Sequence, residues 1–218
     1  MALAIFDLDN TLLAGDSDYL WAEFLVENNI VDGDYYQAEN QRFYDQYLAG
    51  TMDIFEFLAF QLKPLADNSL ADLHRWRTQY LQQKIDPIIL PAALKLIEHH
   101  RQQGDTLLII TATNQFITAP IAAKLNIPNL IATNAEMIDG IYTGKVVGTP
   151  SYQQGKVERL KEWLIEYQQS LKGSCFYSDS HNDLPLLNLV DHPIAVDPDT
   201  KLRTVAEQQG WKILSLRE

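Results

Sequence analysis

Two aspartates, Asp7 and Asp9, stand two positions apart at the end of the apolar segment 4–8, and acids in this position could do chemistry. An apolar run of this length predicts a strand that is buried on both faces. Residues two apart on a strand share a face, so the two carboxylates would lie together. They would repel each other unless a cation lay between them. The alternative is an acidic loop edge in which Thr11 opens a helix.

Polar side chains also follow two later apolar segments, and a lysine opens a helical pattern. The segments 106–113 and 174–180 each indicate a strand that ends in polar groups, and Lys156 follows Gly155 at a helix start. In a parallel sheet the site lies at the carboxyl ends of the strands, so these groups would converge on the first acid pair. The positions concerned are Thr111, Ala112, Thr113, Asn114, Lys156, Asp179, Ser180, His181, Asn182 and Asp183.

Carboxylates, one ammonium and several hydroxyl and amide groups suit a hard divalent cation with a phosphate, because Mg²⁺ takes oxygen ligands. One aspartate of the pair would attack phosphorus and form an aspartyl-phosphate. The other would protonate the leaving oxygen and then deprotonate water. Lys156 and Mg²⁺ would balance the charge of the phosphoryl group, and Thr111 would hold its oxygens. Taken singly, each group also has a plain structural interpretation as a strand end, a solvated lysine or a helix cap.

The composition is that of an ordinary globular chain, with 46% hydrophobic and 21% charged residues among 218. The formal net charge of −12 disfavours nucleic acid or an anionic membrane surface as the main partner. No apolar run approaches the roughly 20 residues of a membrane span, and the N-terminus lacks the basic start of a secretion signal. The single cysteine, Cys175, cannot form an internal disulfide, so we expect a reducing, cytoplasmic location.

The elements that must position these groups fall into two blocks. Residues 15–84 show several stretches with helical spacing and no convincing strand. From residue 85 onward apolar strands alternate with helical patterns, which predicts a parallel sheet with helices on both faces. An Asp139-Gly140 pair between apolar runs predicts a hairpin. The expected strands are 4–8, 106–113, 129–133, 174–180 and 192–198.

The segments "DLDNTL", "TATN" and "SDSHNDLP", together with Lys156, resemble the four motifs of the haloacid dehalogenase-like superfamily, in the usual order. The resemblance implies an α/β fold with a Rossmann-like parallel sheet, helices on both faces and an inserted all-helical cap. The catalytic core would comprise residues 1–14 and 85–218. The cap, of the C1 type, would comprise residues 15–84 and is similar to that of the phosphoserine-phosphatase-like branch.

The resemblance also implies a role for individual residues. Asp7 would be the nucleophile and Asp9 the general acid and base. Superfamily dehalogenases lack the second acid of the first motif, so Asp9 favours phosphoryl chemistry. The implied phosphate-binding residues are Thr111, Ala112, Lys156 and Asn182. The implied Mg²⁺ site consists of Asp7, the backbone carbonyl of Asp9 and Asp179, with Asp183 in support.

Specificity is expected to lie in the cap. Phosphoserine phosphatases usually carry an arginine shortly after a Phe-Glu pair to hold the substrate carboxylate, whereas residues 58–62 here contain none. Acids with aromatic residues suit a substrate that carries an ammonium group and a ring. Alternatively, the aromatic residues form the core of the cap and the acids cap its helices. The residues expected to set specificity are Asp16, Asp18, Trp21, Phe55 and Glu56, with Phe43, Tyr44, Tyr47 and Phe57 nearby.

These features predict a Mg²⁺-dependent phosphomonoesterase that acts on a small phosphorylated metabolite. The leading substrate is an amino-alcohol phosphate, L-histidinol phosphate, because some similar phosphoserine-phosphatase-like enzymes are histidinol-phosphatases. One alternative is a phosphoserine phosphatase in which Arg42 or Arg75 supplies the missing cation. Two others are a phosphomutase, which also uses paired aspartates, and a scaffold that binds metal or a phosphorylated partner without turnover. We expect His181 to shape its loop, because Asp9 already covers proton transfer.

Overall fold

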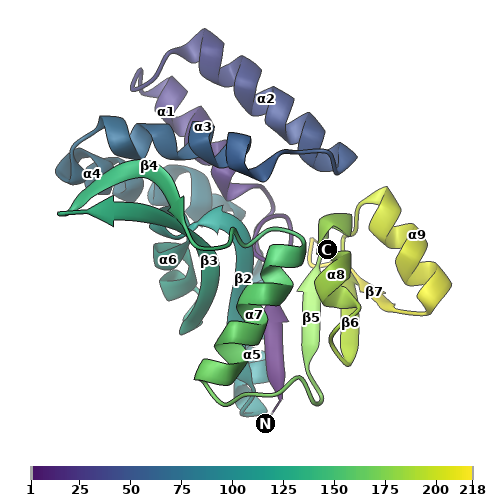
Figure 1. The fold of residues 1–218 in the computed structure, drawn as a ribbon. Helices are drawn as coiled ribbons and strands as arrows, with labels where there is room; N and C mark the ends of the chain where they lie inside the picture. The colour runs from purple at the N-terminus through teal and green to yellow at the C-terminus, as the bar shows by residue number, and fades with distance from the viewer. Residues whose placement is uncertain (1, 218) are drawn as a thin grey trace.

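The computed structural model describes residues 2–217, and its framework is a sheet with the strand order β4-β3-β2-β1-β5-β6-β7 (Figure 1). Neighbouring strands run parallel, except that β3 and β4 form an antiparallel hairpin. The strands are β1 (Leu3–Phe6), β2 (Thr106–Asn114), β3 (Asn129–Ile138), β4 (Ile141–Val147), β5 (Cys175–Ser178), β6 (His192–Val196) and β7 (Lys212–Leu214).

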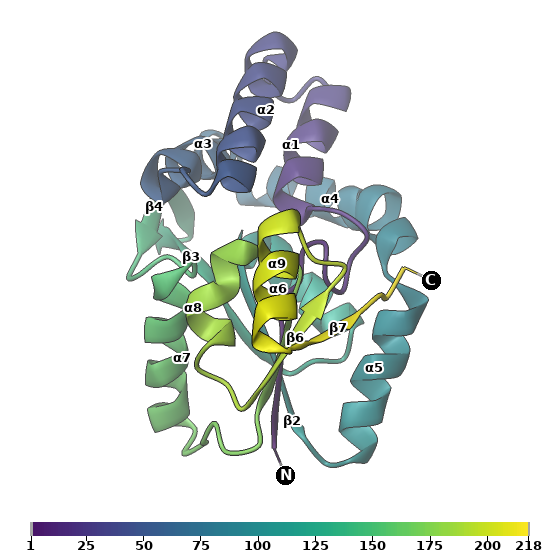
Figure 2. The same cartoon turned by 90° about the vertical axis from the view of Figure 1, so that its right-hand side faces the viewer.

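The central strands are buried on both faces because helices cover both. In β1, Ala4 and Phe6 belong to one hydrophobic cluster, whereas Leu3 and Ile5 belong to the other. Residues of α5 and α6 belong to the first cluster, and residues of α7, α8 and α9 belong to the second. Figure 2 shows α5 on one side of the central strands and α7 and α8 on the other. These helices are α5 (Pro91–Gln102), α6 (Gln115–Lys124), α7 (Gln154–Glu166), α8 (Leu184–Leu187) and α9 (Thr200–Gln209), with a 3-10 turn η3 (His181–Asp183) before α8.

Strand pairing brings the carboxyl ends of three strands to one edge of the sheet. Phe6, the last residue of β1, lies opposite Ile109 of β2 and Tyr177 of β5. The N–H of Asp7 continues the ladder by donating to the carbonyl of Tyr177 at 2.9 Å. The residues that follow these positions therefore meet at the edge where α/β sheets hold their ligands.

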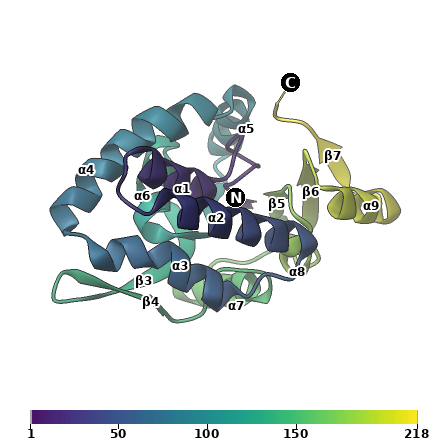
Figure 3. The same cartoon turned by 90° about the horizontal axis from the view of Figure 1, so that it is seen from above.

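The inserted helical cap lies over that edge (Figures 1 and 3). Its helices start at Asp16, Asp32, Asp53 and Ser69, whose side chains each accept a hydrogen bond from an N–H of the first turn. Helix α2 ends at Gly50, which has the left-handed φ of 77°. The helices are α1 (Ser17–Glu27), α2 (Gly33–Ala49), α3 (Ile54–Asp67) and α4 (Leu70–Tyr80), followed by a π-helical turn η1 (Leu81–Ile85) and a 3-10 turn η2 (Asp86–Ile88).

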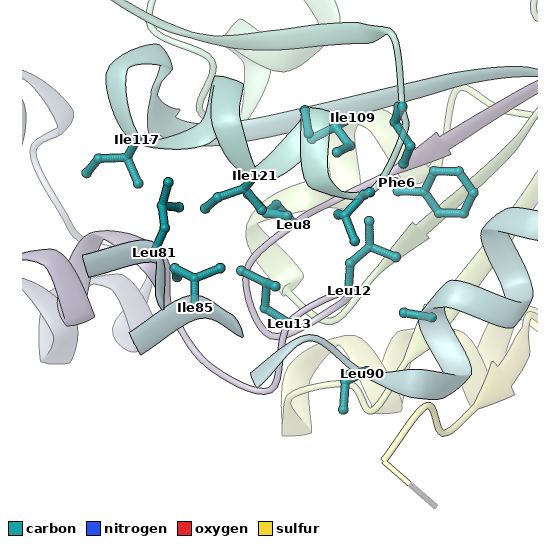
Figure 4. Close-up of a cluster of buried hydrophobic side chains, with 14 of the residues drawn as sticks. Phe6, Leu8, Leu12, Leu13, Leu81, Ile85, Leu90, Ile109, Ile117 and Ile121 are labelled. Carbon is teal, nitrogen blue, oxygen red and sulfur yellow. The ribbon is translucent and has the colours of Figure 1, made fainter. Parts of the chain in front are cut away.

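The chain enters and leaves the cap at adjacent points. Leu13 and Ile89 form an isolated antiparallel bridge, and the N–H of Ala14 donates to the carbonyl of Ile88 at 2.8 Å. These contacts join the two segments that connect the core to the cap. Figure 4 shows the apolar side chains that pack around them, among them Leu8, Leu12, Leu13, Leu81, Ile85 and Leu90.

The cap shares most of its apolar core with the sheet. Trp21 of α1 and Leu58 of α3 belong to the same cluster as Phe6, and only a small cluster around Phe43 and Phe60 lies within the cap. The hairpin of β3 and β4 also packs against α3. Because the core is continuous, the division into domains at residues 14 and 84 stays a prediction.

The expected hairpin is confirmed, with φ values of 51° at Asp139 and 79° at Gly140. Two positive φ values in succession are what a type I′ turn requires. Within residues 2–217, no helix combines the length and the apolar character needed to cross a membrane.

Candidate active site

Asp7 lies at the end of β1 in a buried ion-pair network. Lys156 Nζ lies 2.8 Å from Asp7 Oδ1 and 2.7 Å from Asp183 Oδ1. The other oxygen of Asp183 accepts a hydrogen bond from Ser178 Oγ at 2.7 Å. The network therefore fixes the position of the ammonium beside Asp7, and Asp183 holds the lysine there.

Lys156 reaches this position because α7 begins in a tight loop. Gly155 packs so closely on this loop that a Cβ atom at residue 155 would overlap the carbonyl oxygen of Pro150. Just before it, Gln153 has a left-handed φ of 47°, which a non-glycine residue rarely adopts. The loop geometry directs the first turn of α7, and with it Lys156, into the site.

Asp7 and Asp179 meet at the hydroxyl group of Thr11. Thr11 Oγ1 lies 3.1 Å from Asp179 Oδ1 and 3.5 Å from Asp7 Oδ2. The same oxygen accepts the backbone N–H of Asp179 at 3.1 Å. The Thr11 hydroxyl has a single proton and can donate it to only one of the two carboxylates at a time. The negative charges of Asp7 and Asp179 are therefore not balanced by this contact.

Asp9 faces both the cap and the neighbouring strand. Its Oδ1 accepts the backbone N–H of Ser17 at 2.7 Å, and its Oδ2 accepts the hydroxyl of Thr113 at 2.9 Å. Thr111 Oγ1 lies 3.3 Å from the same Oδ2. The expected phosphate ligand Thr111 is therefore next to Asp9 in this structure.

Burial sets the charge state of these acids. Loss of solvation raises the pKa of Asp7 to about 7, although Lys156 opposes the shift. Burial, reinforced by the charge of Asp16, raises the pKa of Asp9 to about 6. Burial and the charge of Asp7 raise the pKa of Asp179 well above its usual value. Burial alone would lower the pKa of Lys156, but the nearby carboxylates outweigh it and the pKa is raised.

Asn182 connects the core to the cap. Its Nδ2 donates to the backbone carbonyl of Tyr47, near the end of α2, at 3.1 Å. Its Oδ1 accepts hydrogen bonds from the Tyr152 hydroxyl at 3.2 Å and from Gln153 Nε2 at 2.8 Å. His181 lies beside it and binds Asp199 through its backbone N–H and its ring, so its contacts are those of a loop-shaping residue.

A cavity separates the sheet edge from the cap, and both contribute walls to it. The core wall carries the expected catalytic acids, the lysine and the hydroxyl-bearing end of β2, and the cap wall carries acids, aromatic residues and two amides. The core lining consists of Asp7, Asp9, Thr111, Ala112, Thr113, Tyr152, Lys156, Asn182 and Asp183. The cap lining consists of Asp16, Asp18, Tyr19, Asn40, Phe43, Tyr44, Tyr47, Met52, Phe57 and Gln61.

Several lining residues were not singled out from the sequence. For Asn40 and Gln61 the signal is helical spacing: on α2 the lining positions follow i, i+3, i+4 and i+7, and on α3 they follow i and i+4. Met52 and Tyr152 lie outside the helices and give no such signal. Once one residue of a face is known to be in the cavity, the others follow. The residues that were missed are Tyr19, Asn40, Met52, Gln61 and Tyr152.

Three specificity predictions are corrected, because the side chains lie outside the cavity. Trp21 is buried in the shared core, where it stacks on Phe24. Phe55 is 64% exposed on the outer side of α3, and Glu56 pairs with Arg42 at 2.9 Å. Trp21 is two residues from Tyr19, and Phe55 is two residues from Phe57; Tyr19 and Phe57 line the cavity. Two residues along a helix correspond to a rotation of about 200°, so side chains at this spacing point to opposite sides of the helix.

The two arginines considered as carboxylate ligands are engaged elsewhere. Arg42 pairs with Glu39 and Glu56, and Arg75 pairs with Asp72. Neither lines the cavity, whose only Lys or Arg side chain among residues 2–217 is Lys156.

The oxygen donors of the site fit a hard divalent cation. Asp7 and Asp179 both approach the hydroxyl of Thr11, and a cation between them would remove their repulsion. Within residues 2–217 no three or more His, Cys, Asp or Glu side chains form a ready-made metal cluster. This is compatible with Mg²⁺, which commonly uses one or two carboxylates and keeps several waters.

Comparison with known proteins shows the family of the chain. The family model described as haloacid dehalogenase-like hydrolase matches residues 4–188. A histidinol-phosphatase of Neisseria meningitidis is 43% identical over 99% of this chain and 99% of its own length. A phosphoserine phosphatase of Mycobacterium tuberculosis is 32% identical over 99% of this chain and 71% of its own length.

Solved structures show the same fold. A protein of unknown function from Bordetella pertussis is 40% identical and superposes with a TM-score of 0.93, covering 99% of this chain and 98% of that one. A substrate-bound phosphoserine phosphatase, 16% identical, superposes with a TM-score of 0.72 over 100% of this chain and 93% of its own. The second likeness concerns the fold alone.

Proposed function

The chain belongs to the haloacid dehalogenase-like hydrolase family and is a phosphatase of it, and we propose that it hydrolyses a small amino-alcohol phosphate, with L-histidinol phosphate as the first candidate. The observation that carries the proposal is the arrangement around Asp7. This carboxylate pairs with buried Lys156 and lines the same cavity as Asp9 and the acids of the cap.

In the proposed first step, a carboxylate oxygen of Asp7 attacks phosphorus while the bond from phosphorus to the alcohol oxygen breaks. Asp9, with its pKa raised to about 6 by burial, gives its proton to the leaving oxygen. In the second step Asp9 takes a proton from water as the water oxygen attacks the phosphorus of the aspartyl-phosphate. Inorganic phosphate leaves, and Asp7 returns to its carboxylate form.

The phosphoryl group would lie against the core wall of the cavity. Lys156 would balance its negative charge, and the Thr111 hydroxyl with the backbone at Ala112 would hold its oxygens. Asn182 would contribute its amide after exchanging its present contact with Tyr47. All four residues line the cavity, which supports these roles.

Phosphatases of this family generally use Mg²⁺. In this chain Asp7, Asp179 and the backbone carbonyl of Asp9 would hold the ion, with Asp183 in support through Lys156. The bound ion would supply positive charge to the phosphoryl oxygens and relieve the repulsion between the two carboxylates.

The cap wall favours a cationic substrate over an anionic one. Asp16 and Asp18 line the cavity, and burial raises the pKa of both carboxyl groups. An ammonium group beside them would favour their charged forms. No arginine among residues 2–217 lines the cavity, so a substrate carboxylate would meet acids there. The 43% identical histidinol-phosphatase supports L-histidinol phosphate, which has an ammonium group and no carboxylate.

Phosphoserine is the second candidate, because the 32% identical relative is a phosphoserine phosphatase. The engagement of Arg42 and Arg75 with acids outside the cavity weighs against it. A phosphomutase remains an alternative only if turnover needs a phosphorylated sugar.

A panel of phosphomonoesters with Mg²⁺ tests the proposal. We expect L-histidinol phosphate to give the highest kcat/KM, phosphate to be released without an added sugar bisphosphate, and phosphoserine to be poor. Asp18→Asn should raise the KM for the amino-alcohol ester more than the KM for phenyl phosphate, whose phenyl group carries no ammonium group. A clear preference for phosphoserine or for sugar phosphates would refute the proposed substrate.

A further inference from the structure

We propose that the side-chain amide of Gln61 is a specificity-determining group that recognises a neutral nitrogen heterocycle on the substrate. This inference rests on the proposed function and refines it. Gln61 lies on α3, one helical turn after Phe57, and lines the cavity with it. It is 3% exposed, and its Nε2 has no hydrogen-bond partner among residues 2–217.

A buried amide group without a partner lowers stability, because it has lost its hydrogen bonds to water. A cavity wall is a place where a ligand can supply the missing partner. The amide of Asn40, on the facing helix α2, differs because its Nδ2 already donates to the carbonyl of Tyr19 at 3.2 Å. Gln61 is therefore the amide of the cap wall whose nitrogen has no hydrogen-bond partner among residues 2–217.

The surroundings of Gln61 suit a flat ring. Phe43 and Phe57 line the cavity and meet edge to face, with ring centroids 5.3 Å apart. Met52 adds a flexible apolar side chain to the same cavity. Aromatic rings in such a wall can stack on or pack edge to face with a heterocycle.

The chemistry of the amide matches that of a neutral imidazole. Imidazole has one N–H donor and one nitrogen acceptor, and a glutamine amide can donate through Nε2 or accept through Oε1. Either tautomer of the ring can thus pair with Gln61. The amide carries no charge, so it offers a substrate carboxylate far less than an arginine would.

The test compares two amino-alcohol phosphates, L-histidinol phosphate with a ring and O-phosphoethanolamine without one, in Gln61→Leu. Leucine keeps a similar volume and removes the amide. We expect the KM for L-histidinol phosphate to rise about tenfold or more, with kcat nearly unchanged, because one buried hydrogen bond is lost. The KM for O-phosphoethanolamine should stay the same, and the Tm should not fall, because no protein partner is lost.

Gln46→Leu is the matched control. Gln46 lies on α2, its buried Oε1 also lacks a partner, and it does not line the cavity. We expect Gln46→Leu to leave both KM values unchanged. Equal KM increases for both substrates, or a lower Tm in Gln61→Leu, would assign Gln61 a structural role and overturn the inference.

The two proposals fail in different ways. If the wild-type enzyme prefers L-histidinol phosphate but Gln61→Leu leaves its KM unchanged, the role of Gln61 is wrong and the proposed function stands. If the wild-type enzyme does not prefer it, the proposed substrate fails, and the inference fails with it.

Discussion

The Oδ1 atom of Asp9 lies 2.7 Å from the backbone nitrogen of Ser17, the first residue of the cap helix α1. The other oxygen of the carboxylate accepts the hydroxyl proton of Thr113 on β2. The proposed general acid is therefore held between cap and sheet. It also lies at the positive end of the α1 dipole, which favours its charged form.

Ser17→Pro should reduce kcat by at least about tenfold, because it removes the N–H that orients the general acid. Proline is favoured at the first position of a helix, and Asp16 already has the extended φ and ψ, −102° and 118°, that precede proline well. The steady-state kcat and the Tm are measured together. Ser17→Ala, which keeps the N–H, should retain kcat; an unchanged kcat in Ser17→Pro would show that the contact is not needed.

Lys156→Met should lower the free energy of unfolding by about 3 kcal/mol near pH 8, because Asp7 and Asp183 then face each other without a cation. Burial raises the pKa of Asp7 to about 7, so protonation of Asp7 should shrink the loss near pH 5. Urea unfolding at the two pH values, without metal, measures the difference. A loss that is equal at both would mean that Lys156 does not neutralise Asp7.

The metal-free protein should lose stability as the pH rises from about 4 to about 7. An unfolded aspartate titrates near pH 3.9, whereas burial raises the pKa values of Asp7 and Asp9 to about 7 and about 6. Over this window the folded state binds more protons than the unfolded state, so the free energy of unfolding falls as the pH rises. The decrease is complete once the pH exceeds the pKa values of the folded state.

Mg²⁺ should oppose this loss, because a cation favours the charged carboxylates, and its stabilising effect should grow with pH. The Tm with and without Mg²⁺ across the window measures the effect. Asp179→Asn should flatten both the pH dependence and the Mg²⁺ effect. A Tm that does not respond to Mg²⁺ near pH 8 in the wild-type protein would argue against the metal site.

The core of the fold follows from local sequence patterns. Apolar runs gave the central strands, and the Asp139-Gly140 turn gave the hairpin, because both signals depend on neighbouring residues only. Asp7, Lys156 and Asp183 converge because parallel strands end at one edge, a rule that needs no side-chain detail. The strand β7 and the helix α9 were not predicted; α9 buries only Leu202 and Ala206 and so gives a weak pattern.

The cap residues show why the rest could not be predicted. Phe55 and Phe57 are both aromatic and two positions apart, yet only Phe57 lines the cavity. Which of them faces inward depends on how α3 is rotated against the sheet and the hairpin, and the local sequence does not record that rotation. The same applies to Tyr19, which lines the cavity, and Trp21, which packs into the core.

The most direct measurement is mass spectrometry of acid-quenched Asp9→Asn protein after mixing with p-nitrophenyl phosphate and Mg²⁺. The p-nitrophenolate leaving group needs no proton, so this variant should still complete the first step, and it lacks the group proposed to activate water, so the covalent form should accumulate. We predict one phosphoryl group per chain, located on Asp7 by fragmentation and absent from the Asp7→Asn/Asp9→Asn double variant. A phosphoryl group on any other residue would contradict the role of Asp7 as the nucleophile, as would turnover that persists in Asp7→Asn.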